Sequence, residues 1–165
     1  MNSRFPRFAL ILVVLGLCSA CGYGVHGRAD LPITEVAIGA IENRTLEPKV
    51  QDKLHRALVE EFTKNGIQVR NTADHTITAT VKTFEMHILT EKKDIAVEYR
   101  ITVNADFVIR GPDGKVRLLR NISSPFMVTL TESNALETLL ARKEIAEERA
   151  MRDISMEVVG SLIYR

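Results

Sequence analysis

Cys21 stands in a setting that predicts covalent modification. Arg4 and Arg7 precede the apolar run Phe8–Leu17, and small residues lead from that run to Cys21. A basic stretch, a short apolar stretch and a small-residue cleavage site are the three parts of a secretory signal. Residues 1–20 are therefore predicted to be a cleaved signal peptide. Cys18-Ser19-Ala20-Cys21 looks like a bacterial lipobox, whose last cysteine carries diacylglycerol and becomes the new N-terminus.

Other interpretations of this segment are weaker. Cys18 occupies a position where leucine is usual, but if Cys18 were the modified residue, bulky Leu17 would stand beside the cut. A disulfide between Cys18 and Cys21 would be lost on cleavage. A transmembrane anchor needs about 20 apolar residues, which Phe8–Leu17 does not supply. Gly22 is not the aspartate associated with inner-membrane retention, so we expect the outer membrane, with lipid anchoring on the periplasmic side.

The other residue types that support catalysis or metal binding do not form a recognisable site. Glu60-Glu61 and Glu147-Glu148 are neighbours in sequence, which do not face each other on a helix, so we interpret them as solvated charge. The sequence has no glycine-rich phosphate loop and no nucleophile motif. It therefore predicts no enzyme, no metal site and no cofactor. The histidines lack the spacing of metal ligands and are interpreted as solvated or half-buried: His26, His55, His75 and His87.

A basic pair, Lys92 and Lys93, lies between the two longest predicted strands, at the tip of a hairpin. Two adjacent ammonium groups on a two-stranded arm could bind a phosphate or an acidic sugar. The alternative is an ordinary solvated turn, in which Glu91 and Asp94 balance the two lysines.

Composition limits the classes of partner. The chain has 165 residues, 45% of them hydrophobic, with 22 basic and 21 acidic side chains. Removing Arg4 and Arg7 with the signal leaves 20 basic against 21 acidic residues, a net charge of −1. A near-neutral domain argues against general nucleic-acid binding, which needs a strongly basic surface.

Hydrophobic periodicity divides the mature chain into one α+β domain over residues 34–165, behind a lipidated N-terminus and short tether at 21–33. The strand that begins near His75 changes phase at Lys82-Thr83, which predicts a β-bulge. Pro48 is expected to start the first helix and Asn65-Gly66 to end it. Its apolar residues fall on one stripe, made of Val50, Leu54, Ala57, Leu58 and Phe62. Strands are expected at 34–41, 67–69, 75–88, 95–110 and 116–128. Gly111-Pro112-Asp113-Gly114 predicts a turn after the fourth of these strands, and Pro125 is expected to bend the fifth or to mark an edge. The last helix is expected to run from a cap at Ser133 or Asn134 to about Tyr164.

The order of elements indicates an α+β fold, with a mostly antiparallel four-stranded sheet and two helices packed on one face. The strand 95–110 alternates apolar and polar residues without a break, so its second face must meet water or a polar partner. Leu140, Lys143, Ala146, Ala150, Ile154 and Val158 are among the residues expected on the side of the last helix that covers the core, and Lys143 is the only polar one.

Several short motifs, in this order, resemble the LptE family of lipopolysaccharide-assembly lipoproteins of the outer membrane. The resemblance covers nearly the whole mature chain. It rests on Cys21-Gly22-Tyr23, Val36-Ala37-Ile38, Glu42-Asn43-Arg44-Thr45 with Glu47-Pro48, Leu58 with Glu61-Phe62, and Glu98-Tyr99-Arg100-Ile101-Thr102-Val103-Asn104-Ala105 before a long terminal helix.

The resemblance implies a non-enzymatic plug inside a large β-barrel, LptD, that helps this barrel to assemble and assists insertion of lipopolysaccharide into the outer leaflet. It also implies a lipopolysaccharide contact at Lys92, with Lys93 beside it. A second basic site before the last helix is not evident, because residues 131–134 contain no Lys or Arg.

The alternative is a periplasmic outer-membrane lipoprotein that activates a peptidoglycan synthase, a class that also has a strand, an Asn-Arg-Thr-like loop and a helix. Such proteins usually carry a long tether for crossing the periplasm. About ten residues separate Cys21 from the first strand here, a reach of about 35 Å at most, which favours a partner in the same membrane. The third interpretation is a lipoprotein with another role.

Overall fold

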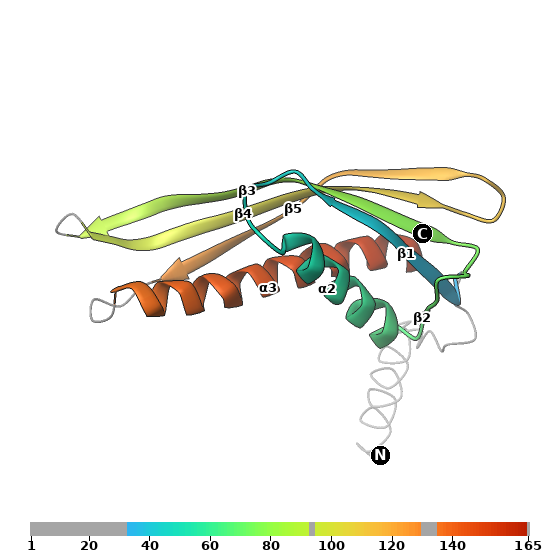
Figure 1. Cartoon of the computed structure of the whole chain (residues 1–165), viewed down its shortest axis with the longest axis horizontal. Helices are drawn as coiled ribbons and strands as arrows, with labels where there is room; N and C mark the ends of the chain where they lie inside the picture. The colour runs from blue at the N-terminus through green and yellow to red at the C-terminus, as the bar shows by residue number, and fades with distance from the viewer. Residues whose placement is uncertain (1–32, 93–94, 130–134, 165) are drawn as a thin grey trace, which may run out of the picture. The chain divides into compact units, whose positions relative to one another are not determined.

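The computed structural model describes residues 33–92, 95–129 and 135–164, without the side chains of residues 88, 90–92, 95–97, 126–129 and 135–139. Five strands form one sheet in the order β2-β1-β3-β4-β5, and the two helices lie on the same side of it (Figure 1). The elements are β1 (Glu35–Asn43), α2 (Val50–Lys64), β2 (Gln68–Val69), β3 (Thr76–Lys92), β4 (Ile95–Arg110), β5 (Val116–Thr129) and α3 (Ala135–Ile163).

The expected mostly antiparallel four-stranded sheet is not exact: the sheet has five strands and is mixed, although its two longest ladders are antiparallel. β1 runs parallel to both of its neighbours, β2 and β3, whereas β4 is antiparallel to both of its neighbours, β3 and β5. The parallel pairing of β1 follows from the connection that leaves this strand. Helix α2 separates β1 from the strands that follow, and a helical crossover returns the chain so that the next strand runs in the same direction. The α+β class and the two helices on one face are confirmed.

Helix α2 follows its predicted apolar stripe. Val50, Leu54, Leu58 and Phe62 are fully buried against the sheet and α3. The helix begins at Val50, two residues later than Pro48, because Lys49 adopts a left-handed conformation with φ 62°. At its other end the backbone N–H and the side-chain amide of Asn65 both donate to the Glu61 carbonyl, before Gly66 at φ 83°.

The bulge predicted in β3 is confirmed. The register against β4 shifts between Val81 and Thr83, so Lys82 is the extra residue. The shift keeps the apolar side chains on one face, since Val81 pairs with Ala105 and Phe84 pairs with Val103. Two further shifts near Thr90 were not predicted.

The core lies between the sheet and the helices. From β4, five alternating residues are buried: Ile101, Val103, Ala105, Phe107 and Ile109. The expected α3 residues Ala146, Ala150, Ile154 and Val158 are buried as well. Leu140 is 56% exposed, so its predicted burial is wrong. Periodicity places Leu140 on the correct side of the helix, but burial also requires an opposing surface. The expected caps, Ser133 and Asn134, lie outside the described residues.

Strand β5 is the outer strand of the sheet, as Pro125 led us to expect for a bend or an edge. Its register against β4 shifts between Leu119 and Ile122, where Arg120 and Asn121 together face the single residue Asp106. Asn121 adopts φ 57°, and its N–H donates to the Asp106 carboxylate at 2.8 Å. The bulge thus bends the free edge of the sheet.

Candidate functional site: the β3 arm and the notch at its base

The structure leaves the sequence-predicted site residues untested. Cys21 and Lys93 lie outside the described residues. Lys92 is the last residue of β3, and its side chain is not described. The backbone does place Lys92 at the end of a hairpin, since it pairs with Ile95, the first residue of β4. The expected hairpin position is therefore confirmed, while any ligand contact there stays a prediction.

The hairpin that carries Lys92 extends well past the end of β1. Pairing between β1 and β3 ends with Asn43 opposite Val81, whereas β3 continues to Lys92 (Figure 1). On the other side of this hairpin, β5 follows β4 as far as Thr129 opposite Glu98. We define the arm as the part of β3 from Thr83 to Lys92, with the segments of β4 and β5 that pair beside it.

A hollow of about 350 Å³ lies where β1 stops and the arm begins. We call it the notch. One wall is the loop after β1, and the other wall is the bulge and first residues of the arm. Leu46, in the loop, is fully exposed at this position. The lining residues are Arg44, Thr45, Leu46, Glu47, Lys82, Thr83, Phe84 and Glu85.

The Asn43-Arg44-Thr45 motif shapes the loop wall of the notch. The Asn43 side-chain oxygen accepts hydrogen bonds from the backbone N–H and the hydroxyl of Thr45, at 2.9 and 2.8 Å. The Asn43 amide donates to the Glu47 carbonyl at 2.8 Å. Short polar side chains that bond to the backbone two to four residues away replace regular pairing in turns. These bonds fix the loop and leave Leu46 pointing to solvent.

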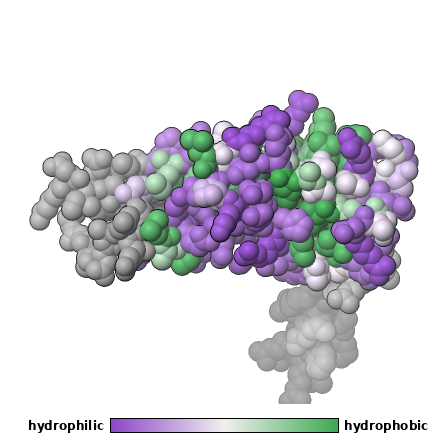
Figure 2. Space-filling model, in the orientation of Figure 1, coloured by the Kyte–Doolittle hydropathy of each residue, from purple (hydrophilic) through white to green (hydrophobic). Residues whose placement is uncertain are grey.

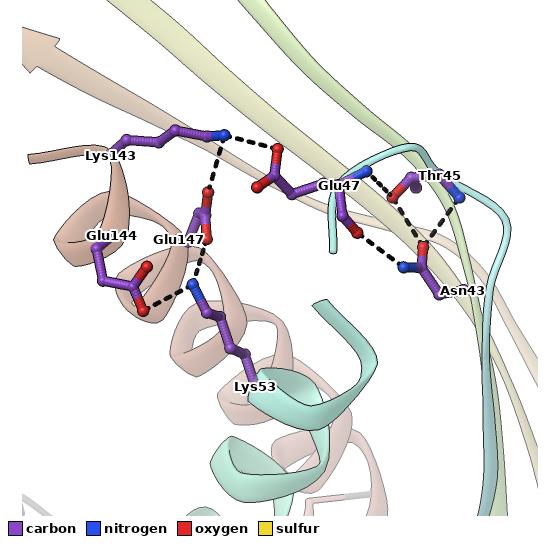
Figure 3. A network of polar contacts seen from close by, with 7 residues as sticks. All are labelled: Asn43, Thr45, Glu47, Lys53, Lys143, Glu144 and Glu147. Atoms are coloured by element: carbon purple, nitrogen blue, oxygen red, sulfur yellow. Dashed lines mark hydrogen bonds and ion pairs between the residues drawn. The ribbon is translucent and has the colours of Figure 1, made fainter. Parts of the chain in front are cut away.

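A largely buried ionic network joins this loop to both helices (Figure 3). Lys143 on α3 pairs with Glu47 of the loop at 2.6 Å and with Glu147 at 3.6 Å. Lys53 on α2 pairs with the same Glu147 and, at 2.8 Å, with Glu144. The charges of two helices and one loop therefore meet at Glu147, whose residue is only 2% exposed.

Burial sets the protonation behaviour of this network. Desolvation raises the pKa of Glu147 above its ordinary value, although Lys53 and Lys143 oppose the effect. For Lys53, desolvation lowers the pKa, but hydrogen bonds and charge attraction from Glu144 and Glu147 outweigh it, so the pKa is raised overall. Charges removed from water are tolerated only when they are paired in this way.

The interpretation of the two glutamate pairs as solvated charge is wrong for one member of each. Glu147 and Glu61 are buried, while Glu148 and Glu60 are exposed. Adjacent helix residues point about 100° apart, so one can enter the core while the other faces water. Lys143 was expected among apolar residues on the covered side of α3, and this was the available signal for a buried charge partner.

The network also reaches the arm. The Lys143 ammonium lies 5.5 Å from the centre of the Phe84 ring, a distance at which a cation and an aromatic ring attract each other. Phe84 lines the notch. Lys143 therefore connects the helix pair with both walls of the notch, through Glu47 on one side and Phe84 on the other.

The surface shown in Figure 2 is mostly hydrophilic, with apolar side chains in smaller groups. On the sheet face away from the helices, Lys82 pairs with Asp106 at 2.9 Å, and a backbone hydrogen bond from Asn121 together with Lys82 lowers the pKa of Asp106. The apolar residues Val116 and Leu118 of β5 are about half exposed, at 53% and 50%. The prediction of a polar second face is thus correct for the centre of the sheet, and the β5 edge is more apolar.

Within residues 33–92, 95–129 and 135–164, no group of three His, Cys, Asp or Glu side chains is placed to hold a metal ion. His55 and His87 are exposed and His75 is half-buried, as expected, whereas His26 lies outside the described part of the chain. Neither described helix combines the length and apolar character needed to cross a membrane.

Comparison with known proteins gives a family match across nearly all of the described residues. Residues 33–162 match the model of the family LptE, described as "Lipopolysaccharide-assembly". No curated protein sequence matches the chain.

Solved structures share the fold at low sequence identity. A minor lipoprotein from Acinetobacter baumannii aligns with TM-score 0.53 and 14% identity, covering 80% of this chain and 92% of that one. Rare lipoprotein B from Shewanella oneidensis aligns with TM-score 0.53 and 12% identity, covering 74% and 93%. An uncharacterized lipoprotein B from Nitrosomonas europaea aligns with TM-score 0.51 and 16% identity, covering 84% and 88%.

Proposed function

The chain belongs to the LptE family of lipopolysaccharide-assembly proteins, and from this premise we propose that it is a lipoprotein of the outer membrane that plugs an LptD-like β-barrel. In that position it helps the barrel to assemble and assists insertion of lipopolysaccharide into the outer leaflet. The observation that carries the proposal is the family match over residues 33–162, which spans every described strand, helix α2 and all but the last residue of α3.

The physical properties of the domain are compatible with a barrel interior. Lumen-facing residues of large membrane barrels are polar, so a plug must present polar surfaces on several sides. The domain does so on the sheet face at Lys82 and Asp106, and most of the face in Figure 2 is hydrophilic. Its expected net charge of −1 avoids strong repulsion from either sign of lumen charge.

Membrane attachment is proposed through acyl chains on Cys21. Each buried methylene contributes about 0.8 kcal/mol, so a cysteine with two or three chains remains on the membrane. We expect Cys21→Ser to release the chain from the membrane fraction or to block its processing. Intact mass measurement of the protein from its native cells should find the acylated cysteine, and an unmodified Cys21 thiol would contradict the proposal.

The partner is tested by co-purification. The full acylated chain, isolated from outer membranes in mild detergent, should retain an LptD-like barrel in near-equal amount. Retention of a peptidoglycan synthase in its place would support the alternative role and overturn the proposed one. The acylated form is required, because the proposal assigns the lipid a part in holding both proteins in one membrane.

The lipopolysaccharide contact is proposed at Lys92 and Lys93. Two ammonium groups at the hairpin end can attract the phosphates of lipopolysaccharide, and the attraction should weaken with added salt. We expect Lys92→Glu with Lys93→Glu to weaken lipopolysaccharide binding by the purified protein. Arg110→Glu with Lys115→Glu is the matched control, since it makes the same charge change around the β4–β5 turn at the opposite end of β4. Equal binding by both variants would remove the ligand role from the tip.

A further inference from the structure

The arm has a backbone edge that no described strand covers. β1 pairs with β3 only as far as Val81, and the last backbone hydrogen bond on that side in the described part of the chain runs from the Arg44 N–H to the Val81 carbonyl, at 2.9 Å. Beyond this bond β3 continues to Lys92 with β4 on its other side. Among the described residues, the position next to the arm, in line with β1, is therefore unoccupied.

The bulge determines which backbone groups face this open side. Val81 directs its carbonyl toward β1, so in a regular strand the residues two and four places further on would do the same. Lys82 adds one residue to β3, and this shifts the alternation by one. Phe84 and Met86 therefore direct their N–H and C=O groups to the open side, while Thr83 and Glu85 face β4.

The opposite edge of the same sheet carries features that discourage pairing. β5 is bulged at Arg120 and Asn121, and Pro125 has no N–H to donate. Bulges and prolines are the features by which natural proteins protect an exposed edge strand. From Thr83 to Ile88, by contrast, β3 keeps an unbroken register against β4 and contains no proline. Six residues of regular strand span about 20 Å, enough for one partner strand.

Side chains along this edge separate into two rows. Phe84 and Met86 pair with the core residues Val103 and Ile101, so they lie on the helix side of the sheet, yet Met86 is 44% exposed. Leu46, fully exposed in the notch, lies where the edge begins. On the other face Glu85 and His87 pair with each other at 3.0 Å. An added strand would thus meet an apolar row and a polar row.

We propose that the open edge of β3 from Thr83 to Ile88 receives an extended segment of the partner barrel by β-strand addition. The inference rests on the proposed function, which supplies this partner. The partner segment must be extended, because the backbone N–H and C=O groups of an extended strand repeat every two residues, as those of Phe84 and Met86 do along the edge. A helix uses these groups for its own hydrogen bonds. The segment should alternate apolar residues, toward Leu46 and Met86, with polar residues toward Glu85 and His87.

A photo-crosslinking experiment locates the contact in cells. The full acylated chain carries benzoylphenylalanine at Met86 in one variant and at Leu118 on the β5 edge in the matched control, two positions of similar exposure at 44% and 50%. We expect the Met86 probe to crosslink to one extended segment of the barrel, identified by mass spectrometry of the product, and the Leu118 probe to give no product with that segment. A product formed with a second copy of the chain would overturn the choice of partner.

A pair of substitutions separates backbone pairing from side-chain packing. Met86→Pro removes the outward N–H without taking a bond from β4, whereas Met86→Ala removes the side chain and keeps the N–H. Losing one backbone hydrogen bond should weaken barrel binding about tenfold, and Met86→Ala should weaken it by less. Circular dichroism and thermal unfolding establish that both variants fold. If Met86→Pro does not fold, the crosslinking result decides.

The outcomes distinguish the inference from the proposed function. Suppose that the unsubstituted chain retains the barrel but the Met86 probe gives no crosslink to it, or Met86→Pro binds the barrel as tightly as Met86→Ala. Strand addition is then wrong, while the proposed role as a plug is unaffected. If the unsubstituted chain retains no barrel, the proposed function fails and the inference fails with it.

Discussion

The long β3–β4 ladder has two parts that differ in what covers them. Below the bulge at Lys82, Ile77 and Phe107 are buried under the helices at 1% and 0% exposure. Above it, Met86 and Leu89 on the arm are 44% and 38% exposed, although they belong to the same strand as Ile77. Strand formation therefore does not depend on full burial here, since this part of β3 is held by its pairing with β4, which pairs in turn with β5. The covered part supplies stability, and the β3 edge of the arm offers surface.

The largest expected effect tests this division. Phe107→Ala in the covered part should lower the free energy of unfolding by about 3–5 kcal/mol, because it removes a fully buried ring and leaves a cavity. Met86→Ala on the arm should cost less than about 1 kcal/mol, since much of that side chain is already in water. Urea unfolding of both variants gives the comparison. Equal losses would mean that the arm contributes to the core.

The next effect concerns the ionic network that joins both helices to the loop beside the notch. Glu147→Ala removes a shared partner of Lys53 and Lys143, and we expect it to cost about 2 kcal/mol, because both lysines keep another carboxylate, Glu144 and Glu47. Glu148→Ala, one residue further on the exposed side of α3, should change stability by less than about 0.5 kcal/mol. If Glu147→Ala leaves the free energy of unfolding unchanged, the attraction within the buried ion pairs only offsets the cost of their desolvation.

The smallest expected effect is a pH dependence. Since burial raises the pKa of Glu147, the folded chain takes up this proton more readily than the unfolded chain does. The resulting contribution to stability is fully present below the unfolded pKa of 4.5 and is lost as pH rises through the higher folded pKa. The unfolding free energy of the unsubstituted chain, relative to Glu147→Gln, should therefore increase as pH falls from about 7 to about 5.

Glu148→Gln serves as the control for this titration, because its carboxyl is on the solvent side of the same helix. Groups with lowered pKa, such as Asp106, are present in every variant and cancel in the difference. A difference between the unsubstituted chain and Glu147→Gln that does not change with pH would mean that Glu147 titrates alike in the folded and unfolded chains.

Local patterns were sufficient to predict most elements and one irregularity. The phase change at Lys82-Thr83 located the bulge because strand side chains alternate strictly, so an extra residue must appear where the apolar phase switches. The apolar stripe of α2 identified Val50, Leu54, Leu58 and Phe62 for a similar reason. Strand direction could not be derived in this way, since the parallel pairing of β1 with β2 and β3 depends on where the chain returns after α2.

The sequence by itself determined the alternation of β4, the turn at its end and the resemblance to a family, because each depends on residues close together in the chain. Only the tertiary structure decided that Glu147 is buried while Glu148 is not, and that Leu140 is exposed. It also decided that β3 extends beyond β1, which leaves an edge beside the notch that no described strand covers. Burial and pairing depend on the opposing surface, and that surface comes from residues distant in sequence. Lys53, for example, meets Glu147 across 94 residues of chain.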